Sequence, residues 1–233
     1  MARFSKLGRV RFCQATERVG ASRKRFAGLS ADMDILLFGG FLGSGKTTII
    51  SKLLHGIVDS GATAALIENE IGEVGIDDKL VGEMGISVTP LFGGCVCCQI
   101  TGSLIEAVLQ IQKEVDPGWL IVEMTGLALM DRIRADLKRY GVKGIPIHAV
   151  SVADMSRWDK MLTVAHPLAE RQLGGADIVF LNKTDIVQPN SVALEQARQI
   201  SGGLVVPISA HSLGSLELWG MLREGLGLDE VSQ

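Results

Sequence analysis

Three of the four cysteines of this chain lie within four positions, in the stretch LFGGCVCCQ at residues 91–99. Cys95, Cys97 and Cys98 follow two glycines, which are typical of a turn rather than of a buried strand or helix. A disulfide between such close neighbours is strained, whereas three thiolates suit Zn²⁺, Cu(I) or, less tightly, Co²⁺ and Ni²⁺. We interpret the cluster first as a metal site with an open coordination position. Buried structural thiols come second, and a redox-active thiol is a further alternative.

A glycine-rich segment, GGFLGSGKTT, follows an apolar run and precedes a helical pattern. From Gly40 to Thr47 it reads G-x-x-x-x-G-K-T, the loop whose backbone N–H groups surround phosphate oxygens at a helix N-terminus. Lys46 is expected to reach the outer phosphates, and the Thr47 hydroxyl to ligate Mg²⁺. The nucleotide-contacting residues predicted from this loop are Gly40, Gly43, Ser44, Gly45, Lys46, Thr47 and Thr48.

The segment FLNKTD at residues 180–185 indicates which base is bound, since it carries N-K-x-D spacing at Asn182, Lys183 and Asp185. A carboxylate at Asp185 can accept hydrogen bonds from N1–H and the exocyclic amine of guanine. Adenine offers no such pair and would leave the carboxylate unpaired. Ser209 and Ala210, in the segment PISA, are expected near the guanine oxygen. The sequence therefore favours guanine over adenine.

Acidic residues gather after two further apolar runs. Glu123 ends one run in LIVEMTG, with Gly126 three residues later. The segment IENEIGEVGIDD follows another run and contains Glu68, Glu70, Glu73, Asp77 and Asp78. Such crowding near a triphosphate requires positive charge, from Mg²⁺ or a second metal. We name Asp77 and Glu70 as candidates to orient water or to act in the second shell of Mg²⁺; a solvated acidic loop is the alternative.

The elements that must position these groups are short apolar runs alternating with helical patterns. The runs are continuous rather than alternating, as in parallel strands buried on both faces. They predict a P-loop NTPase fold of the α/β class, a mostly parallel sheet of about six or seven strands with helices on both faces. The predicted strands are 34–40, 63–69, 86–91, 119–124, 147–154, 177–183 and 204–209, and the predicted helices are 45–60, 102–115 and 191–200.

Composition limits the class of protein and its partners. The chain has 233 residues, of which 47% are hydrophobic and 21% charged, as in globular proteins. Residues 1–32 carry eight basic residues and two acids, which leaves an acidic remainder and argues against nucleic acid as a partner. No run of eighteen apolar residues predicts a membrane span, and the cysteine pattern favours a reducing cytosol. We expect residues 1–32 to be poorly ordered, with Met33 as the true start, and 33–233 to form one GTP-binding domain.

Taken in order, GGFLGSGKTT, IENEIGEVGIDDKL, GGCVCC, LIVEMTG and NKTD resemble the CobW-type P-loop GTPases, relatives of the HypB and UreG accessory GTPases. The resemblance runs from about Met33 to Ala210. It implies hydrolysis of GTP to GDP and phosphate, with Lys46 and Thr47 on the phosphates and Mg²⁺. It also implies that Glu123 acts on the metal–water–phosphate network and that Gly126 senses the γ-phosphate. No arginine finger stands out in the sequence, so slow intrinsic turnover is expected.

The same resemblance implies a role for the cysteines. The acidic segment would be a nucleotide-dependent switch, and Cys95, Cys97 and Cys98, assisted by Glu68 and Glu73, would bind a transition metal. We expect zinc, with cobalt or nickel as alternatives, and delivery to a metalloenzyme or corrinoid-protein client. His148 and His166 are further candidate ligands, although packing is their simpler role. Relatives usually carry a further C-terminal domain and often dimerise, so the client and a homodimer stay open. The alternatives are a nucleotide-gated activation factor with structural cysteines and, more weakly, a P-loop kinase.

Overall fold

The computed structural model describes residues 33–68, 87–90, 97–124, 130–141 and 144–228, with the backbone alone described at 87–90, 97–101 and 141. The basic head at residues 1–32 lies outside this range, so its expected disorder stays a prediction. Among the described residues, no helix is both long and apolar enough to cross a membrane.

A seven-stranded sheet forms the centre of the molecule, in the order β3-β2-β4-β1-β5-β6-β7. Each neighbouring pair is parallel, so the predicted doubly wound α/β class is confirmed. The strands are β1 Asp34–Gly40, β2 Ala64–Glu68, β3 Ser87–Pro90, β4 Trp119–Glu123, β5 Ile147–Asp154, β6 Ile178–Asn182 and β7 Leu204–Pro207.

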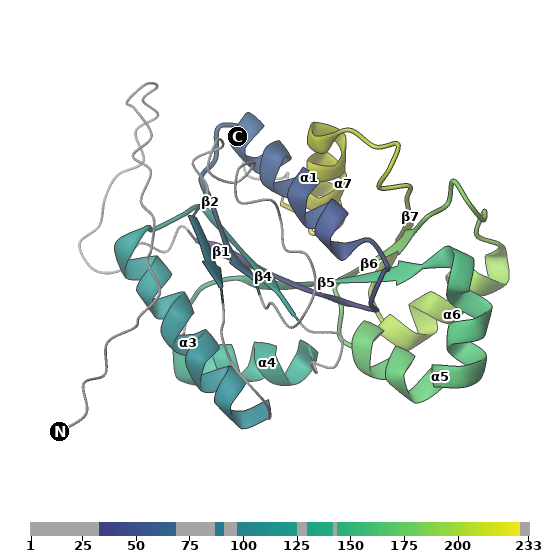
Figure 1. Ribbon diagram of the computed structural model, residues 1–233, viewed down its shortest axis with the longest axis horizontal. Helices are drawn as coiled ribbons and strands as arrows, with labels where there is room; N and C mark the ends of the chain where they lie inside the picture. Colours follow the sequence, from purple (N-terminus) through teal and green to yellow (C-terminus); the bar gives the residue numbers. More distant parts are fainter. Residues whose placement is uncertain (1–32, 69–86, 91–96, 125–129, 142–143, 229–233) are drawn as a thin grey trace.

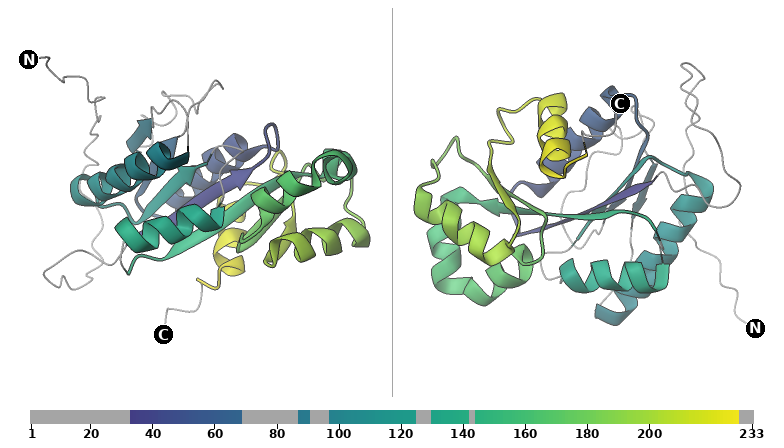
Figure 2. Two further views of the ribbon diagram at one scale, coloured as in Figure 1. Left: turned by 90° about the horizontal axis from the view of Figure 1, so that it is seen from below. Right: turned by 180° about the vertical axis from the view of Figure 1, so that it is seen from behind.

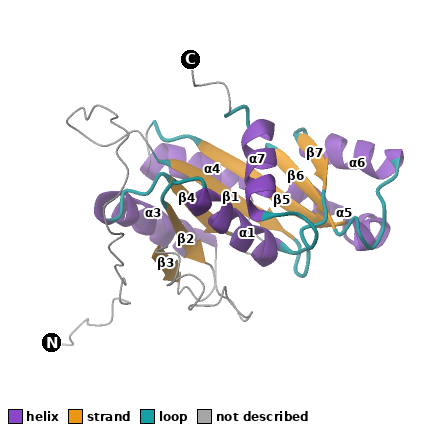
Figure 3. Ribbon diagram, turned by 90° about the horizontal axis from the view of Figure 1, so that it is seen from above, coloured by secondary structure: helices purple, strands orange, loops and turns teal. Residues whose placement is uncertain are grey.

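Helices cover both faces of this sheet, as predicted (Figure 1). Among the described residues, α1 and α7 lie side by side on one face, and α3, α4, α5 and α6 cover the opposite face (Figures 2 and 3). The helices are α1 Lys46–Asp59, α3 Cys97–Glu114, α4 Met130–Asp136, α5 Trp158–Leu173, α6 Ser191–Ser201 and α7 Ser215–Gly225. A π-helical turn, Leu137–Gly141, extends α4, and a 3₁₀ turn, Met155–Arg157, precedes α5.

The central strand β1 explains why the apolar runs are continuous. Its side chains alternate between two cores, and both cores exclude water. Leu36 and Phe38 pack with α1 and α7, while Ile35 and Leu37 pack with α3 and α4. All four are fully buried. The rigid strand holds the loop that follows it, at the start of α1, in a fixed position.

Close backbone packing brings α7 onto α1. A side chain at Gly56 would meet the backbone oxygen of Ser215 and lie 2.7 Å from Trp219 Cβ. Lys52 adds a polar contact, since its Nζ donates to the carbonyl oxygen of Leu213 at 2.5 Å. The segment between β7 and α7, which contains the predicted base-recognition residue Ala210, is thereby anchored to the helix of the phosphate loop.

The structure adds helices that the sequence analysis did not assign. The most irregular is α5, which contains Pro167 and non-helical dihedrals at Ala165 (φ −135°, ψ 32°). Such a kink interrupts the regular periodicity from which helices are predicted. Helix α3 begins at Cys97 rather than at residue 102. The backbone of Cys97 and Cys98 therefore belongs to the first turn of a helix, and not to the preceding turn as the sequence suggested.

Candidate nucleotide-binding site

The carboxyl ends of the parallel strands bring the candidate residues to one edge of the sheet. Glu123 ends β4 beside Phe38 of β1, and Glu68 ends the neighbouring strand β2. On the other side of β1, Asp154 ends β5 directly opposite Asn182, the last residue of β6. In parallel α/β sheets, ligands bind at this edge.

The phosphate loop requires glycine because of its backbone conformation. Gly40, Gly43 and Gly45 have φ values of 128°, 73° and 97°, which L-amino acids rarely adopt. At Gly40 a side chain would also collide with the backbone of Val152 on β5. The loop can therefore lie against the sheet directly before the start of α1.

Lys46 is the first residue of α1, and its side chain folds back over the loop. Its Nζ donates to the carbonyl oxygens of Gly40 and Phe41, each at 3.1 Å, and the residue is only 9% exposed. Thr47 next to it is half-buried, and Thr48 is exposed. The structure thus holds the Lys46 ammonium group against carbonyl groups of the loop. Phosphate binding by Lys46 stays a prediction.

Asn182 ties three segments of the site together. Its Nδ2 donates to the Ser44 carbonyl at 2.9 Å, and its Oδ1 accepts from the Ala210 N–H at 2.9 Å. The residue is 3% exposed, and its Nδ2 is the atom that a side chain at Gly45 would strike. The sequence analysis assigned Asn182 to the residues that recognise guanine. In the structure its amide connects the phosphate loop to the segment after β7.

The two predicted base-recognition segments also contact each other directly. Ser209 Oγ donates to Asp185 Oδ1 at 2.7 Å, and this hydrogen bond lowers the pKa of the exposed Asp185 carboxyl. The Thr184 N–H donates to the Ile208 carbonyl at 3.2 Å. Asp185 is therefore oriented and ionised at neutral pH, as an acceptor of guanine N–H groups must be.

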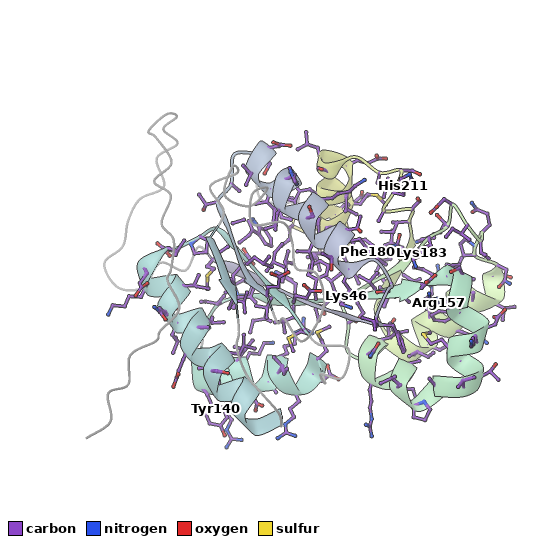
Figure 4. The ribbon with its side chains drawn as sticks, viewed as in Figure 1. Lys46, Tyr140, Arg157, Phe180, Lys183 and His211 are labelled. Carbon is purple, nitrogen blue, oxygen red and sulfur yellow. The ribbon has the colours of Figure 1, made fainter. Side chains whose placement is uncertain are left out.

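Lys183 connects the same segment to the phosphate loop. It has a left-handed conformation (φ 69°), and its Nζ donates to the Gly43 carbonyl at 2.7 Å. The same Nζ lies 2.7 Å from Asp154 Oδ2. Arg157 Nε lies 3.6 Å from that oxygen, and its guanidinium extends beside Gly43. Figure 4 shows Lys46, Arg157 and Lys183 in one region of the molecule, with Tyr140 far away.

Most of the predicted metal ligands cannot be placed. Glu68 and Glu123 are half-buried at their strand ends. Among the described side chains, no group of three or more His, Cys, Asp or Glu residues could hold a metal ion. The predicted residues that lie outside the described ranges are Glu70, Glu73, Asp77, Asp78, Cys95 and Gly126, and the side chains of Cys97 and Cys98 are not described.

The two candidate histidine ligands have other neighbours. His148 Nε2 lies 3.1 Å from Asp34 Oδ1, near the amino ends of β5 and β1 and thus on the opposite edge of the sheet. His166 Nδ1 lies 3.6 Å from Glu170 Oε1 on the outer surface of α5. The structure therefore favours packing and surface roles for both.

Comparison with known proteins identifies the family. The model of the nucleotide-binding domain of CobW, HypB and UreG matches residues 34–206. The chain belongs to this family. It is 30% identical over 210 residues to the zinc chaperone YjiA of Escherichia coli K12, in an alignment that covers 84% of this chain and 63% of YjiA. The chain thus spans less than two thirds of the length of this relative.

Solved structures of family members share the fold. HypB from Archaeoglobus fulgidus superposes with a TM-score of 0.59 and 16% identity, over 84% of this chain and 91% of that one. The Zn(II)-bound YjiA GTPase from E. coli gives 0.56 and 21%, over 79% and 62%. The predicted P-loop architecture is confirmed by these similarities.

Two residues of the candidate site, Asp154 and Arg157, were missed by the sequence analysis. Asp154 is the final residue of the apolar run IHAVSVAD, and an acid that ends a strand at the ligand-binding edge was the available signal. Nothing in the sequence pairs it with Lys183, because that contact depends on β5 lying beside β6.

Proposed function

We propose that the chain binds GTP and hydrolyses it slowly to GDP and phosphate, and that nucleotide state alters its affinity for a transition metal ion, zinc in the first place. The observation that carries the nucleotide assignment is the double hydrogen bond of Asn182 to Ser44 and Ala210. It joins a phosphate loop and a base-recognition segment into one site.

Guanine is the proposed base because Asp185 is fixed by Ser209 as an ionised acceptor. Two N–H groups on one edge of guanine match such a carboxylate, whereas adenine would leave it unpaired. The Ala210 N–H donates to Asn182 Oδ1, which fixes the segment after β7 relative to the end of β6. Lys183, in the same motif, connects the base-recognition segment to the phosphate loop by its hydrogen bond to the Gly43 carbonyl.

For hydrolysis, we assign the phosphates to the loop N–H groups and Lys46. The Thr47 hydroxyl and the Glu123 carboxylate would supply the hard oxygen ligands that suit Mg²⁺, and the ion would neutralise charge on the phosphates. We also propose that Gly126 senses the γ-phosphate and that Glu70 and Asp77 orient the attacking water.

The metal-binding half of the proposal is supported by the three cysteines and by the names of the relatives. YjiA is described as a zinc chaperone, and one of its structures is Zn(II)-bound. Cys95, Cys97 and Cys98, with Glu68 and Glu73, are the ligands we propose, in a reducing cytosol. Cobalt and nickel rank after zinc, and a metalloprotein or corrinoid protein is the proposed client. An activation factor with structural cysteines is the alternative.

Base choice is tested by Asp185→Asn. The amide exchanges an acceptor for a donor, so GTP affinity should fall by about 100-fold, the cost of leaving guanine N–H groups unpaired. Xanthosine triphosphate, which carries an oxygen in place of the exocyclic amine, should bind the variant better than the wild type. Asp59→Asn, at the exposed end of α1, is the matched control. Unchanged preference for GTP over ATP in Asp185→Asn would refute the base assignment.

The metal half is tested by competition titration of Zn²⁺, Co²⁺ and Ni²⁺ under reducing conditions, with GDP or a non-hydrolysable GTP analogue. Combined substitution of Cys95, Cys97 and Cys98 by serine should remove tight binding, whereas Cys13→Ser, at the remaining cysteine, should not. Binding that ignores either the three cysteines or the nucleotide would contradict the proposed coupling, because coupling requires different metal affinities in the two states.

A further inference from the structure

We propose that Asp154 is a positioning residue of the nucleotide site, which acts by holding the Lys183 ammonium against the carbonyl group of Gly43. Through this contact the carboxylate would fix the phosphate loop relative to the base-recognition segment. The inference rests on the proposed function, because it concerns the same nucleotide.

Both oxygens of Asp154 are engaged, and the residue is only 4% exposed. Oδ1 accepts from the N–H and the hydroxyl of Ser156, at 2.9 and 2.6 Å, which caps the 3₁₀ turn after β5. Oδ2 accepts from Lys183 Nζ at 2.7 Å. A carboxylate held by its own strand and by this cap cannot follow Lys183. Instead, Lys183 must take the position that Asp154 defines.

The position of Lys183 matters because its Nζ has a second acceptor. It donates to the Gly43 carbonyl, a peptide group of the phosphate loop, at 2.7 Å. Asp154 Oδ2 also lies 3.6 Å from Arg157 Nε, and the guanidinium of Arg157 extends beside Gly43. Removing the negative charge would leave two cations next to each other without their shared counter-ion, and both would move apart.

The ionisation of Asp154 supports this role. Burial raises the pKa of its carboxyl, but the hydrogen bonds from Lys183 and Ser156 outweigh burial, and the net pKa lies below the ordinary 3.8. The carboxylate is therefore charged at neutral pH. The hydrogen bond that it accepts from Lys183 is a charge-assisted one. Asparagine at this position keeps the shape and one acceptor but loses the charge.

The test uses the full chain and fluorescently labelled GDP. Asp154→Asn should weaken GDP and GTP binding by about tenfold, the loss expected from one charge-assisted hydrogen bond. Its preference for guanine over adenine nucleotides should be unchanged, because Asp185 is intact. The matched control is Asp177→Asn, at the opposite end of β6. Asp177 also accepts from an arginine, Arg134, and from a backbone N–H, that of Ala149 at 2.8 Å. The control should lower stability without changing GDP affinity.

A double-mutant cycle with Lys183→Ala separates positioning from a general structural effect. If Asp154 acts through Lys183, Asp154→Asn should change GDP affinity less than twofold in the Lys183→Ala background. Additive losses, or full affinity of Asp154→Asn beside a wild type that binds GDP, would overturn this inference alone. A wild type that binds no guanine nucleotide would overturn the proposed function and this inference with it.

Discussion

Substituting Gly45 by alanine should reveal how much the Asn182 bridge stabilises the fold. Gly45 precedes α1 with φ 97°, and a side chain there would strike Asn182 Nδ2, which donates to the Ser44 carbonyl. Gly61, at the end of the same helix, provides the control. It has φ 83°, and a side chain there would meet no atom within 4 Å. Both substitutions therefore strain the backbone, but only Gly45→Ala displaces the asparagine.

The two costs can be estimated separately. An L-residue in the left-handed region costs about 1–2 kcal/mol, which both variants incur. At Gly45 the Asn182 amide must also leave the Ser44 carbonyl, and an unsatisfied buried polar group costs about 1–3 kcal/mol. We expect Gly61→Ala to lose about 1–2 kcal/mol of unfolding free energy and Gly45→Ala about 2–5 kcal/mol, the sum of the two terms.

Urea unfolding of the whole chain without nucleotide measures this difference. The slope of the unfolding free energy against urea concentration should be the same for all variants, so that the unfolding midpoints report stability alone. In an Asn182→Ala background the excess cost of Gly45→Ala over Gly61→Ala should vanish, because the displaced group is gone. Equal losses for the two glycine variants in the wild-type background would refute the reasoning.

Two further predictions concern charge and packing. Burial raises the pKa of Asp154, but the hydrogen bonds from Lys183 and Ser156 and the charge of Lys183 together outweigh it. The lowered pKa means that the ionised carboxylate stabilises the fold. The stability difference between wild type and Asp154→Asn should be constant above about pH 5 and shrink as pH falls below 3.8 and through the lowered pKa; a difference that persists unchanged into acid would contradict this. Gly56→Ala should cost about 1–3 kcal/mol by overpacking against Trp219, while Gly220→Ala, on open surface of α7, should stabilise by about 0.5–1 kcal/mol. Thermal unfolding of both variants measures this difference. Equal stability changes in Gly56→Ala and Gly220→Ala would show that α1 and α7 can move apart at no cost, which would contradict the prediction.

Strand positions could be predicted because burial on both faces leaves a direct mark on the sequence. The run 147–154 coincides with β5, and 34–40 with β1. The kinked helix α5 left no such mark, since Pro167 breaks its pattern. Helix α3 was predicted to start at residue 102 because the cysteines at its first turn carry no helical periodicity.

In the candidate site, too, some residues could be predicted from the sequence and some contacts could not. Lys46 and Asp185 were predictable, because each belongs to a motif whose spacing is local in the sequence. The role of Asn182 was predicted only in part: the motif names the residue, but its bonds to Ser44 and Ala210 cross 138 and 28 positions of chain. Such contacts follow from the order of strands, which no local pattern encodes.

Asp154 and Asn182 stand opposite each other in the β5–β6 register, and both act on the phosphate loop. Asn182 bonds to the Ser44 carbonyl directly, whereas Asp154 acts on Gly43 through Lys183. Two neighbouring peptide groups of the phosphate loop are thus held from the strand that carries base recognition. A base that displaces Lys183 would therefore also shift the phosphate loop. On this reasoning, recognition of guanine and alignment of the phosphates are one structural event, and weakening either anchor should lower affinity before it alters the choice of base.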